Sequence, residues 1–179
     1  MDIIKEVGAF KILKYLIFTL WEAVFHVLLF SPLRVWWMRL GGTKIGKNPV
    51  IGNLYFMNLY RRGLPGLTVG NNCFIGNRVV FDLADEIEIG TEVTLSDEVF
   101  LLTHTNVGYK NHPLQKFFPN YSKKIVMQNG VFVGIRATIF PGVTLGEESA
   151  VGACSLVTKD VPARELHAGV PAKLIRQFS

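Results

Sequence analysis

The amino-acid sequence predicts a mainly β protein: a left-handed parallel β-helix built from hexapeptide repeats. An apolar helical segment precedes it, and one long excursion loop interrupts it. Two observations carry this prediction. An aliphatic residue recurs at every sixth position over long stretches, and in most repeats a glycine follows it. A period of six fits neither an α-helix nor an ordinary alternating strand, but it is typical of a solenoid.

The period is clearest in the last third of the chain. Aliphatic residues stand there without a break at Met127, Val133, Ile139, Leu145, Val151 and Val157. Small or β-branched residues follow four positions after the first five, at Val131, Ala137, Val143, Ser149 and Ser155. Three hexapeptides would form one triangular coil, and stacked coils would bury a continuous aliphatic column. We expect the glycine to help the chain turn the corner, where a side chain would be costly.

Residues 42–179 form the predicted β-helix domain, and two segments within it lack the period. Residues 104–124 carry two prolines and predict the excursion loop. Long loops in compact repeats are usually functional. Residues 54–65, rich in tyrosine and arginine, predict a second loop that faces a membrane or a substrate. Residues 160–179 are expected to form a C-terminal tail.

Residues 1–41 form an apolar helical segment. Its polar residues recur three or four positions apart, which places them in one narrow stripe on a helix: Lys11, Tyr15, Thr19, Glu22 and His26. Pro32 breaks the helix, and Trp36 and Trp37 follow between two arginines, as in an anchor at the level of lipid headgroups. We favour attachment to a membrane surface. Packing against the β-helix and a spanning helix are the alternatives, and Glu22 argues against spanning.

Charge and cysteine content limit the partners. The chain of 179 residues has a formal net charge of +5, which suits anionic lipids or phosphorylated cofactors. No nucleic-acid motif is present, so no nucleic-acid partner is expected. Cys73 and Cys154 both fall at repeat positions that favour small inward side chains. They lie several coils apart, beyond disulfide reach, so we expect two reduced core residues in the cytoplasm.

One histidine stands where chemistry is expected. His104 lies at the point where a regular coil gives way to the loop, and an imidazole there can act as a general base near neutral pH. His112 and His167 have weaker positions. The three histidines form no recognisable ligand pattern, so no metal site is expected.

Residues 69–179 resemble the hexapeptide acyltransferases, in particular the maltose, galactoside and nodulation-factor O-acetyltransferases. The motifs are Ile87–Gly90, Thr103-His104, Phe132–Gly134, Ile139–Gly146, Val151–Pro162 and Gly169–Arg176. The resemblance implies an O-acetyltransferase that uses acetyl-CoA and no metal. It also implies a homotrimer with active sites in the grooves between β-helices, and His104 as the base that deprotonates an acceptor hydroxyl.

The resemblance also assigns binding residues. Asp82 would face the acceptor sugar. Ile75 replaces an asparagine that some members use, which leaves nearby Asn77 as a candidate for the same role. The residues that would bind acetyl-CoA or stabilise the oxyanion are Phe132, Gly134, Ile135, Ala153, Thr158, Lys159 and Arg176. Of these, backbone N–H groups near Gly134 and Ile135 would stabilise the oxyanion, and the basic pair would meet the phosphates of CoA.

The departures from the family bear on the acceptor. Phe132 stands where the family usually has tryptophan, and Cys154 where glycine is common. The N-terminal cap of the sugar-acetylating enzymes is replaced by the apolar segment. This favours a lipid-linked or polysaccharide intermediate, acetylated at the inner face of the cytoplasmic membrane. The alternatives are a small soluble acceptor, such as serine or an antibiotic, and a catalytically silent scaffold subunit.

Overall fold

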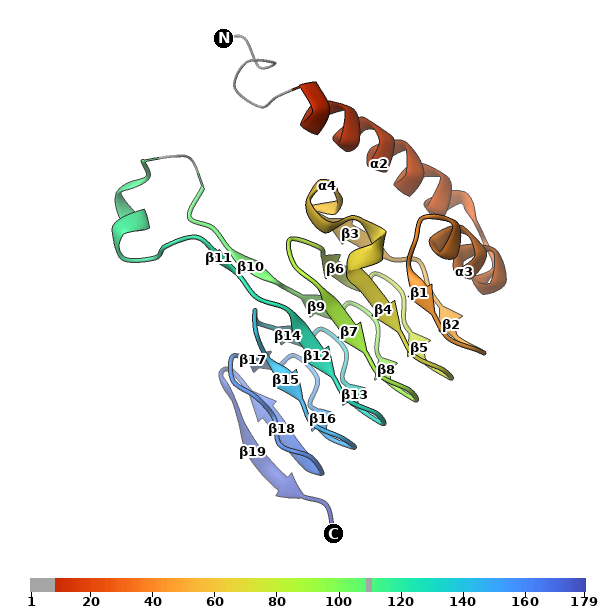
Figure 1. The fold of residues 1–179 in the computed structure, drawn as a ribbon. Helices are drawn as coiled ribbons and strands as arrows, with labels where there is room; N and C mark the ends of the chain where they lie inside the picture. The colour runs from red at the N-terminus through yellow and green to blue at the C-terminus, as the bar shows by residue number, and fades with distance from the viewer. Residues whose placement is uncertain (1–8, 109–110) are drawn as a thin grey trace.

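The structure is a computed structural model that describes residues 9–108 and 111–179. Three sheets of parallel strands form the faces of a β-helix (Figure 1). Sheet A contains β1 (Lys44–Ile45), β4 (Leu67–Val69), β7 (Ile87–Ile89), β12 (Ile125–Met127) and β15 (Thr144–Leu145). Sheet B contains β2 (Val50–Ile51), β5 (Phe74–Ile75), β8 (Thr94–Leu95), β13 (Phe132–Val133) and β16 (Ala150–Val151), and the terminal pair β18 (Glu165–Gly169) and β19 (Ala172–Gln177). Sheet C contains β3 (Tyr55–Met57), β6 (Val80–Asp82), β9 (Phe100–Leu101), β14 (Thr138–Ile139) and β17 (Leu156–Val157).

The chain visits the sheets in the order A, B, C, so each coil of three strands stacks on the coil before it. The register places residues of the hexapeptide period directly over one another. Val133, for example, lies between Leu95 and Val151. All six aliphatic positions of the late run are at most 2% exposed. The predicted repeat and its aliphatic column are therefore confirmed.

The glycine that follows the aliphatic residue has a different role from the one expected. A Cβ atom on Gly70 would lie 2.3 Å from the carbonyl oxygen of Gly90 in the next coil, and the backbone there does not have a positive φ. The left-handed conformation that turns the corner falls two residues later, at Asn72 and Glu92. A side chain is costly at the glycine because stacked coils approach closely there.

The same corner geometry corrects the expectation for Cys154. Cys154 takes the left-handed corner position with φ 56° and is exposed, while the next residue, Ser155, points inward. Cys73 is buried as expected, and burial raises the pKa of its thiol. Both cysteines are free.

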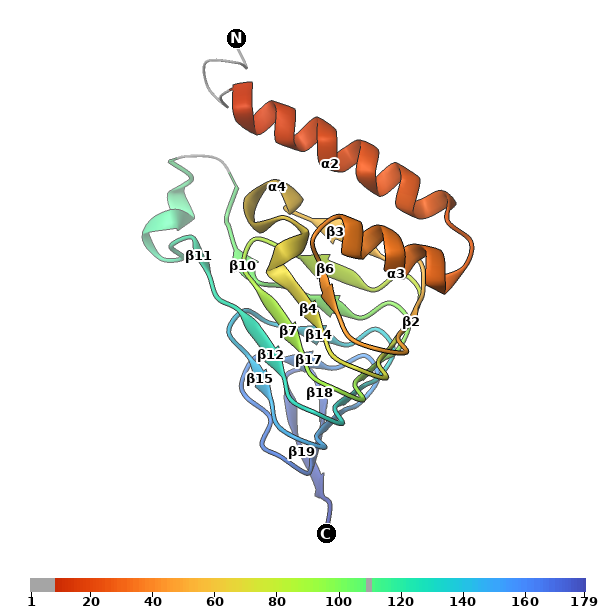
Figure 2. The ribbon, with the colours of Figure 1, turned by 45° about the vertical axis from the view of Figure 1, so that its right-hand side comes forward.

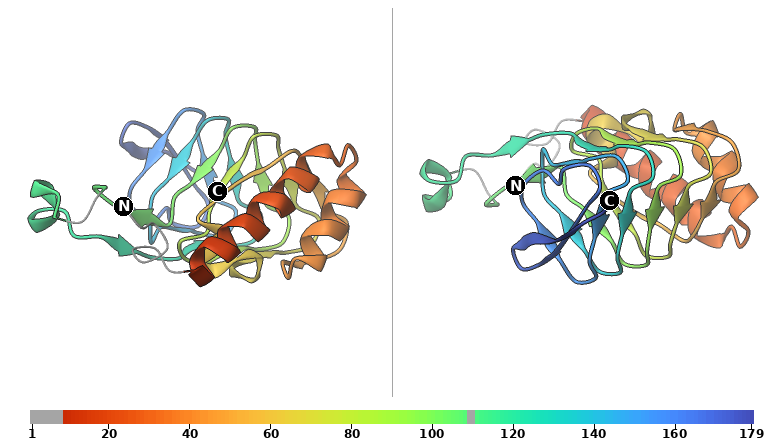
Figure 3. Two further views of the ribbon diagram at one scale, coloured as in Figure 1. Left: turned by 90° about the horizontal axis from the view of Figure 1, so that it is seen from above. Right: turned by 90° about the horizontal axis from the view of Figure 1, so that it is seen from below.

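Both segments that lack the repeat leave the β-helix at the corner between sheets C and A. Residues 54–65 are not simply a loop, because they contain β3, α4 (Leu59–Arg62) and the start of the short 3₁₀ helix η1 (Leu64–Gly66). The long excursion leaves and returns as an antiparallel pair, β10 (His104–Thr105) with β11 (Tyr121–Ser122), and carries η2 (Pro113–Lys116). It stands out from the body of the molecule (Figure 3).

Two helices, α2 (Ala9–Val27) and α3 (Ser31–Leu40), cover the first coil (Figure 2). Phe25 of α2 and Met38 of α3 are fully buried where these helices contact the β-helix. Glu22 accepts a hydrogen bond from the N–H of Phe56 at 2.9 Å, and His26 lies 2.7 Å from the Asn53 side chain. The helices therefore pack against the β-helix, and part of the predicted polar stripe faces the protein instead of water.

The opposite end of the β-helix is closed by the antiparallel hairpin of β18 and β19, which extends sheet B. The segment expected to be a tail is thus largely ordered strand. Among the described residues, no helix is both long and apolar enough to cross a membrane.

Candidate active site

Asp82 and His104 come together at the corner between sheets C and A. Asp82 ends β6, and His104 follows β9, which pairs with β6 in the next coil. The Asp82 side chain is fully buried, and its Oδ2 lies 2.5 Å from Nδ1 of His104. The same oxygen accepts the backbone N–H groups of Thr103 at 2.9 Å and of His104 at 3.1 Å.

The other carboxylate oxygen of Asp82 is also fully engaged. Asn58 donates to Oδ1 at 2.7 Å, and the N–H of Ala84 donates at 3.2 Å. Burial by itself raises the pKa of Asp82, but hydrogen bonds from His104, Asn58 and Thr103 outweigh it and hold the pKa below its ordinary value. Asp82 is therefore a buried carboxylate anion that fixes the orientation of the imidazole ring.

These contacts correct the expectation that Asp82 faces the acceptor sugar. A side chain with no exposed surface and with both oxygens bonded to protein donors has no group left for a substrate. The aspartate at this position instead contacts His104.

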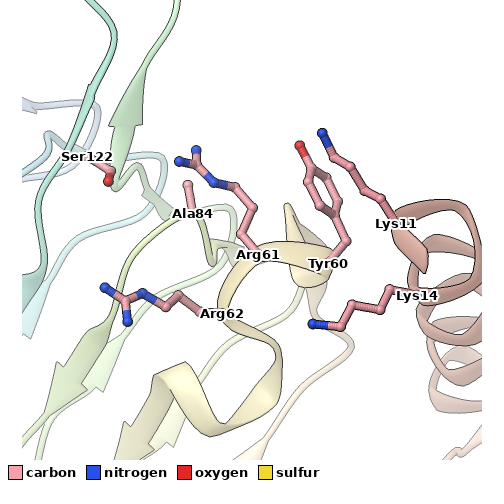
Figure 4. A pocket seen from close by; sticks show the side chains of 7 residues that line it. All are labelled: Lys11, Lys14, Tyr60, Arg61, Arg62, Ala84 and Ser122. Atoms are coloured by element: carbon pink, nitrogen blue, oxygen red, sulfur yellow. The ribbon is translucent and has the colours of Figure 1, made fainter. Parts of the chain in front are cut away.

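The imidazole of His104 opens on a cavity. Its side chain is 22% exposed and lines a cavity of about 290 Å³. The other lining residues come from α4 and from the two arms of the excursion: Arg61, Thr105, Asn106, Asn120, Tyr121 and Ser122. A larger cavity of about 690 Å³, between α2 and α4, shares Arg61 and Ser122 with it (Figure 4). The two cavities thus meet beside His104.

Within one chain, Asn77 lies apart from the His104 cavity. It lies between β5 and β6, at the corner between sheets B and C, whereas His104 lies at the corner between C and A. Its side-chain oxygen accepts the N–H of Asn53 at 3.1 Å, and its own N–H donates to Asp97 at 2.7 Å. Asn77 is therefore part of a polar ladder that links successive coils, and its expected contact with the acceptor stays a prediction that requires the B–C corner of a neighbouring copy.

The residues expected to bind acetyl-CoA are spread over two corners. Gly134, Ile135 and Ala153 follow sheet B strands at the B–C corner, next to the exposed Phe132. Thr158 and Lys159 follow β17 at the C–A corner, and Arg176 lies on β19. Within one chain, the B–C group is on a different corner from His104.

The backbone hydrogen bonds also narrow the expected oxyanion donors. The N–H of Gly134 is committed to the carbonyl of Val151 at 2.8 Å. The N–H of Ile135 donates no hydrogen bond within the part of the chain that the structure describes. Of these two backbone N–H groups, only that of Ile135 is available to stabilise an oxyanion.

Asn58 and Tyr121 were missed from the sequence, whereas Arg61 was noticed only as one arginine of the segment expected to face a membrane or a substrate. All three lie in segments without the repeat, where position along the chain does not predict position in space. Asn58 left one signal, because asparagine is favoured in the left-handed conformation that it adopts here (φ 57°). In residues 9–108 and 111–179, no three His, Cys, Asp or Glu side chains are placed to hold a metal ion.

Comparison with known proteins places this geometry in a family. Residues 66–100 and 129–159 match the family described as "Hexapeptide repeat of succinyl-transferase". WcaF of Escherichia coli, named "Putative colanic acid biosynthesis acetyltransferase", is 33% identical over 144 residues, covering 80% of this chain and 74% of WcaF. The chain belongs to the hexapeptide-repeat acetyltransferases.

Other members resemble this acetyltransferase over shorter or more divergent stretches. Galactoside O-acetyltransferase of Escherichia coli is 34% identical over 130 residues, covering 63% of this chain, and the match spans 64% of that enzyme's length. A solved structure of galactoside acetyltransferase in complex with coenzyme A is 26% identical, with a TM-score of 0.75, covering 99% of this chain and 83% of that one. A Vibrio cholerae hexapeptide-repeat acetyltransferase complexed with acetyl coenzyme A has the same fold, with a TM-score of 0.79 at 23% identity over 97% of this chain and 90% of that one.

Proposed function

We propose that this protein is an acetyl-CoA-dependent O-acetyltransferase that acetylates a hydroxyl of a saccharide, with His104 as the general base. The observation that carries the proposal is the pair formed by His104 and the buried Asp82, at the edge of an open cavity. One relative is named a galactoside O-acetyltransferase and another a putative colanic acid biosynthesis acetyltransferase, so both names refer to saccharides. A catalytically silent scaffold would have no need for a histidine hydrogen-bonded to a buried carboxylate.

The geometry supports a direct transfer. With Nδ1–H donating to Asp82, the lone pair of Nε2 is available to take the proton of the acceptor hydroxyl. The acceptor oxygen then attacks the thioester carbonyl of acetyl-CoA, and the N–H of Ile135 is suited to stabilise the resulting oxyanion. When the intermediate collapses, the C–S bond breaks, and the departing thiolate takes the proton back from His104. No covalent enzyme intermediate is required.

Lys159 and Arg176 would bind the phosphates of acetyl-CoA in the proposed reaction. Both are exposed cations in the C-terminal coils, so they contribute binding that the ground state and the transition state share. Lys159→Ala and Arg176→Ala should raise KM for acetyl-CoA with little change in kcat. If Arg176 pairs with the 3′-phosphate, the variant should also lose discrimination against dephospho-CoA.

A homotrimer of left-handed β-helices would complete the site. Because Ile135 and Ala153 lie at a different corner from His104 in one chain, a site that uses all three must combine corners of two copies. The family resemblance implies this groove between neighbouring β-helices, and the two-corner distribution supports it.

We also propose that α2 and α3 hold the enzyme at an anionic membrane surface. Opposite the packed side, α2 exposes an apolar face that consists of Leu13, Leu16, Ile17, Leu20, Val24 and Val27; Trp36 and Leu40 of α3 are exposed as well. Lys11 and Lys14 of α2 lie on the side of the helix that faces α4, and the chain as a whole carries a formal net charge of +5. An exposed apolar face on a basic protein is complementary to anionic lipid.

Vesicle flotation tests the membrane proposal. Removing residues 1–40 would uncover the buried core beneath α2 and α3, so point substitutions are preferable. Leu16→Glu with Leu20→Glu should abolish flotation with anionic vesicles. Leu174→Glu, at an equally exposed leucine on β19, should not. Self-association through the α2 face in place of lipid binding would contradict the proposal.

Thiol release tests the function itself. The protein is mixed with acetyl-CoA and a panel of lipid-linked glycans, free oligosaccharides and serine, and products are identified by the mass of one added acetyl group. Saccharide-dependent release supports the proposal. Transfer to serine alone would favour the small-acceptor alternative, and no release with any acceptor would favour the scaffold.

A further inference from the structure

The larger cavity beside the site has a composition that acetyl transfer to a neutral sugar does not explain. Four of its seven lining residues are cations: Lys11 and Lys14 from α2, and Arg61 and Arg62 from α4. No acidic side chain lines it. Figure 4 shows the Arg61 side chain extending toward Ala84 and Ser122, the Arg62 side chain below it, Lys14 turned toward α4, and Lys11 beside Tyr60. A cavity lined by charges of one sign concentrates the field and attracts an anion of opposite charge.

Internal contacts offset only part of this charge. Arg62 pairs with Asp85 at 3.1 Å and with Glu86 at 3.7 Å. Lys11 lies 5.0 Å above the ring of Tyr60, a contact that keeps its charge. Arg61 forms no ion pair within the described residues, unlike its neighbour Arg62. The excess of positive charge is therefore greatest around Arg61, the residue that this cavity shares with the His104 cavity.

We propose that this cavity binds the diphosphate of an acceptor in which a diphosphate is attached to the sugar. The inference rests on the proposed function and narrows its substrate class. Arg61 and Ser122 line both cavities, so a sugar beside His104 would place its anionic group among the cations. Planar guanidinium groups match the paired oxygens of phosphates, and two arginines with Lys11 suit a diphosphate better than a single carboxylate.

The donor acetyl-CoA does not explain the cluster. The residues proposed for its phosphates, Lys159 and Arg176, lie in the C-terminal coils, at the far end of the β-helix from α2 and α4 (Figure 1). A small apolar cavity of about 270 Å³ adjoins the cationic cavity, because Lys11 and Tyr60 line both. This neighbour favours a lipid diphosphate over a nucleoside diphosphate as the source of the anion.

Binding is tested first, independently of turnover. Inorganic pyrophosphate is titrated calorimetrically into the full chain, alone and with saturating CoA. We expect binding that survives CoA, weakens with ionic strength, and falls about tenfold or more in Arg61→Gln. Lys47→Gln, which removes an exposed cation at a distant corner, should bind as the wild type does. Binding that CoA abolishes, or that Arg61→Gln leaves intact, would overturn the proposal.

Turnover then distinguishes the sources of the diphosphate. One saccharide is compared in four forms: free, carrying a carboxylate, as a nucleoside diphosphate in solution, and as a lipid diphosphate in vesicles. Either diphosphate form should exceed the free form in kcat/KM by about tenfold or more, and Arg61→Gln should remove that advantage while KM for acetyl-CoA stays within twofold. Equal rates for the free form, or a preference for the carboxylate, would contradict the inference. Absence of transfer to all four forms would reject the proposed function, whereas the pyrophosphate titration would still report on the cavity.

Discussion

At the scale of single residues, Asp82 decides how His104 can act. Its Oδ2 accepts three N–H groups, and its Oδ1 accepts two more. An asparagine at this position cannot reproduce the pattern. Its NH₂ group is a donor, and it would face N–H donors whichever of the two oxygens it replaced. Asp82 is thus a positioning residue, and its effect on the rate passes through the imidazole.

We therefore expect Asp82→Asn to lower kcat on the order of a hundredfold while KM for acetyl-CoA stays near the wild-type value. Steady-state kinetics with both substrates varied would separate the two constants. His26→Gln, which keeps a side-chain contact to Asn53 remote from the cavity, is the control. An unchanged kcat in the Asp82 variant would show that the carboxylate does not position the base.

The low pKa of Asp82 also makes stability depend on pH. The folded pKa lies below the unfolded one, so the unfolded chain binds more protons in acid. The contribution of Asp82 is fully present above the unfolded value of about 4 and is lost as pH falls through the folded value. Urea unfolding from pH 7 down to acid should show a steeper loss for the wild type than for Asp82→Asn. Parallel curves would contradict this role.

The residue scale is also where sequence reasoning fell short. The position of His104 at a coil-to-loop junction could be predicted, because the repeat ends visibly there. The contact between His104 and Asp82 could not be predicted, because it depends on which strand of the next coil lies beside β6. Arg61 was visible as an arginine in a non-repeating segment, but the cavity that it lines requires the paths of two separate excursions.

At the scale of elements, the close stacking of coils determines where glycine is needed. The sequence predicted the period and the buried column, since both follow from local spacing. It did not predict that Gly70 is required because it approaches Gly90 closely, since that depends on the distance between neighbouring coils. Cys154 was placed incorrectly for the same kind of reason: a corner position and an inward position are adjacent in the hexapeptide.

Gly70→Ala should therefore destabilise the β-helix by about 1–3 kcal/mol, the usual cost of forcing an extra methyl group into a packed site. Chemical denaturation measures the difference. Ser96→Ala is the matched control, because Ser96 takes the same place after Leu95 and already carries a Cβ atom. Equal stability of Gly70→Ala and the wild type would show that the coils can separate at little cost.

At the scale of the whole molecule, the two-corner distribution makes a composite active site testable. His104→Ala and Ala153→Trp each disable one corner, so each alone should be nearly inactive. When both chains are co-expressed, some grooves would pair an intact C–A corner with an intact B–C corner, and activity should return. His104→Ala with Asp82→Asn should show no recovery, because both defects lie on one corner. Failure of the first pair to recover would reject a shared site.

In the proposed reaction, His104 removes the acceptor proton during acetyl transfer. The most direct measurement is kcat for thiol release by His104→Ala, with circular dichroism and oligomeric state recorded on the same sample. Removal of a general base predicts a loss of about two orders of magnitude or more, with the fold, the assembly and CoA binding unchanged. A variant that keeps more than about a tenth of the wild-type rate would contradict the account, because general-base catalysis contributes far more than that.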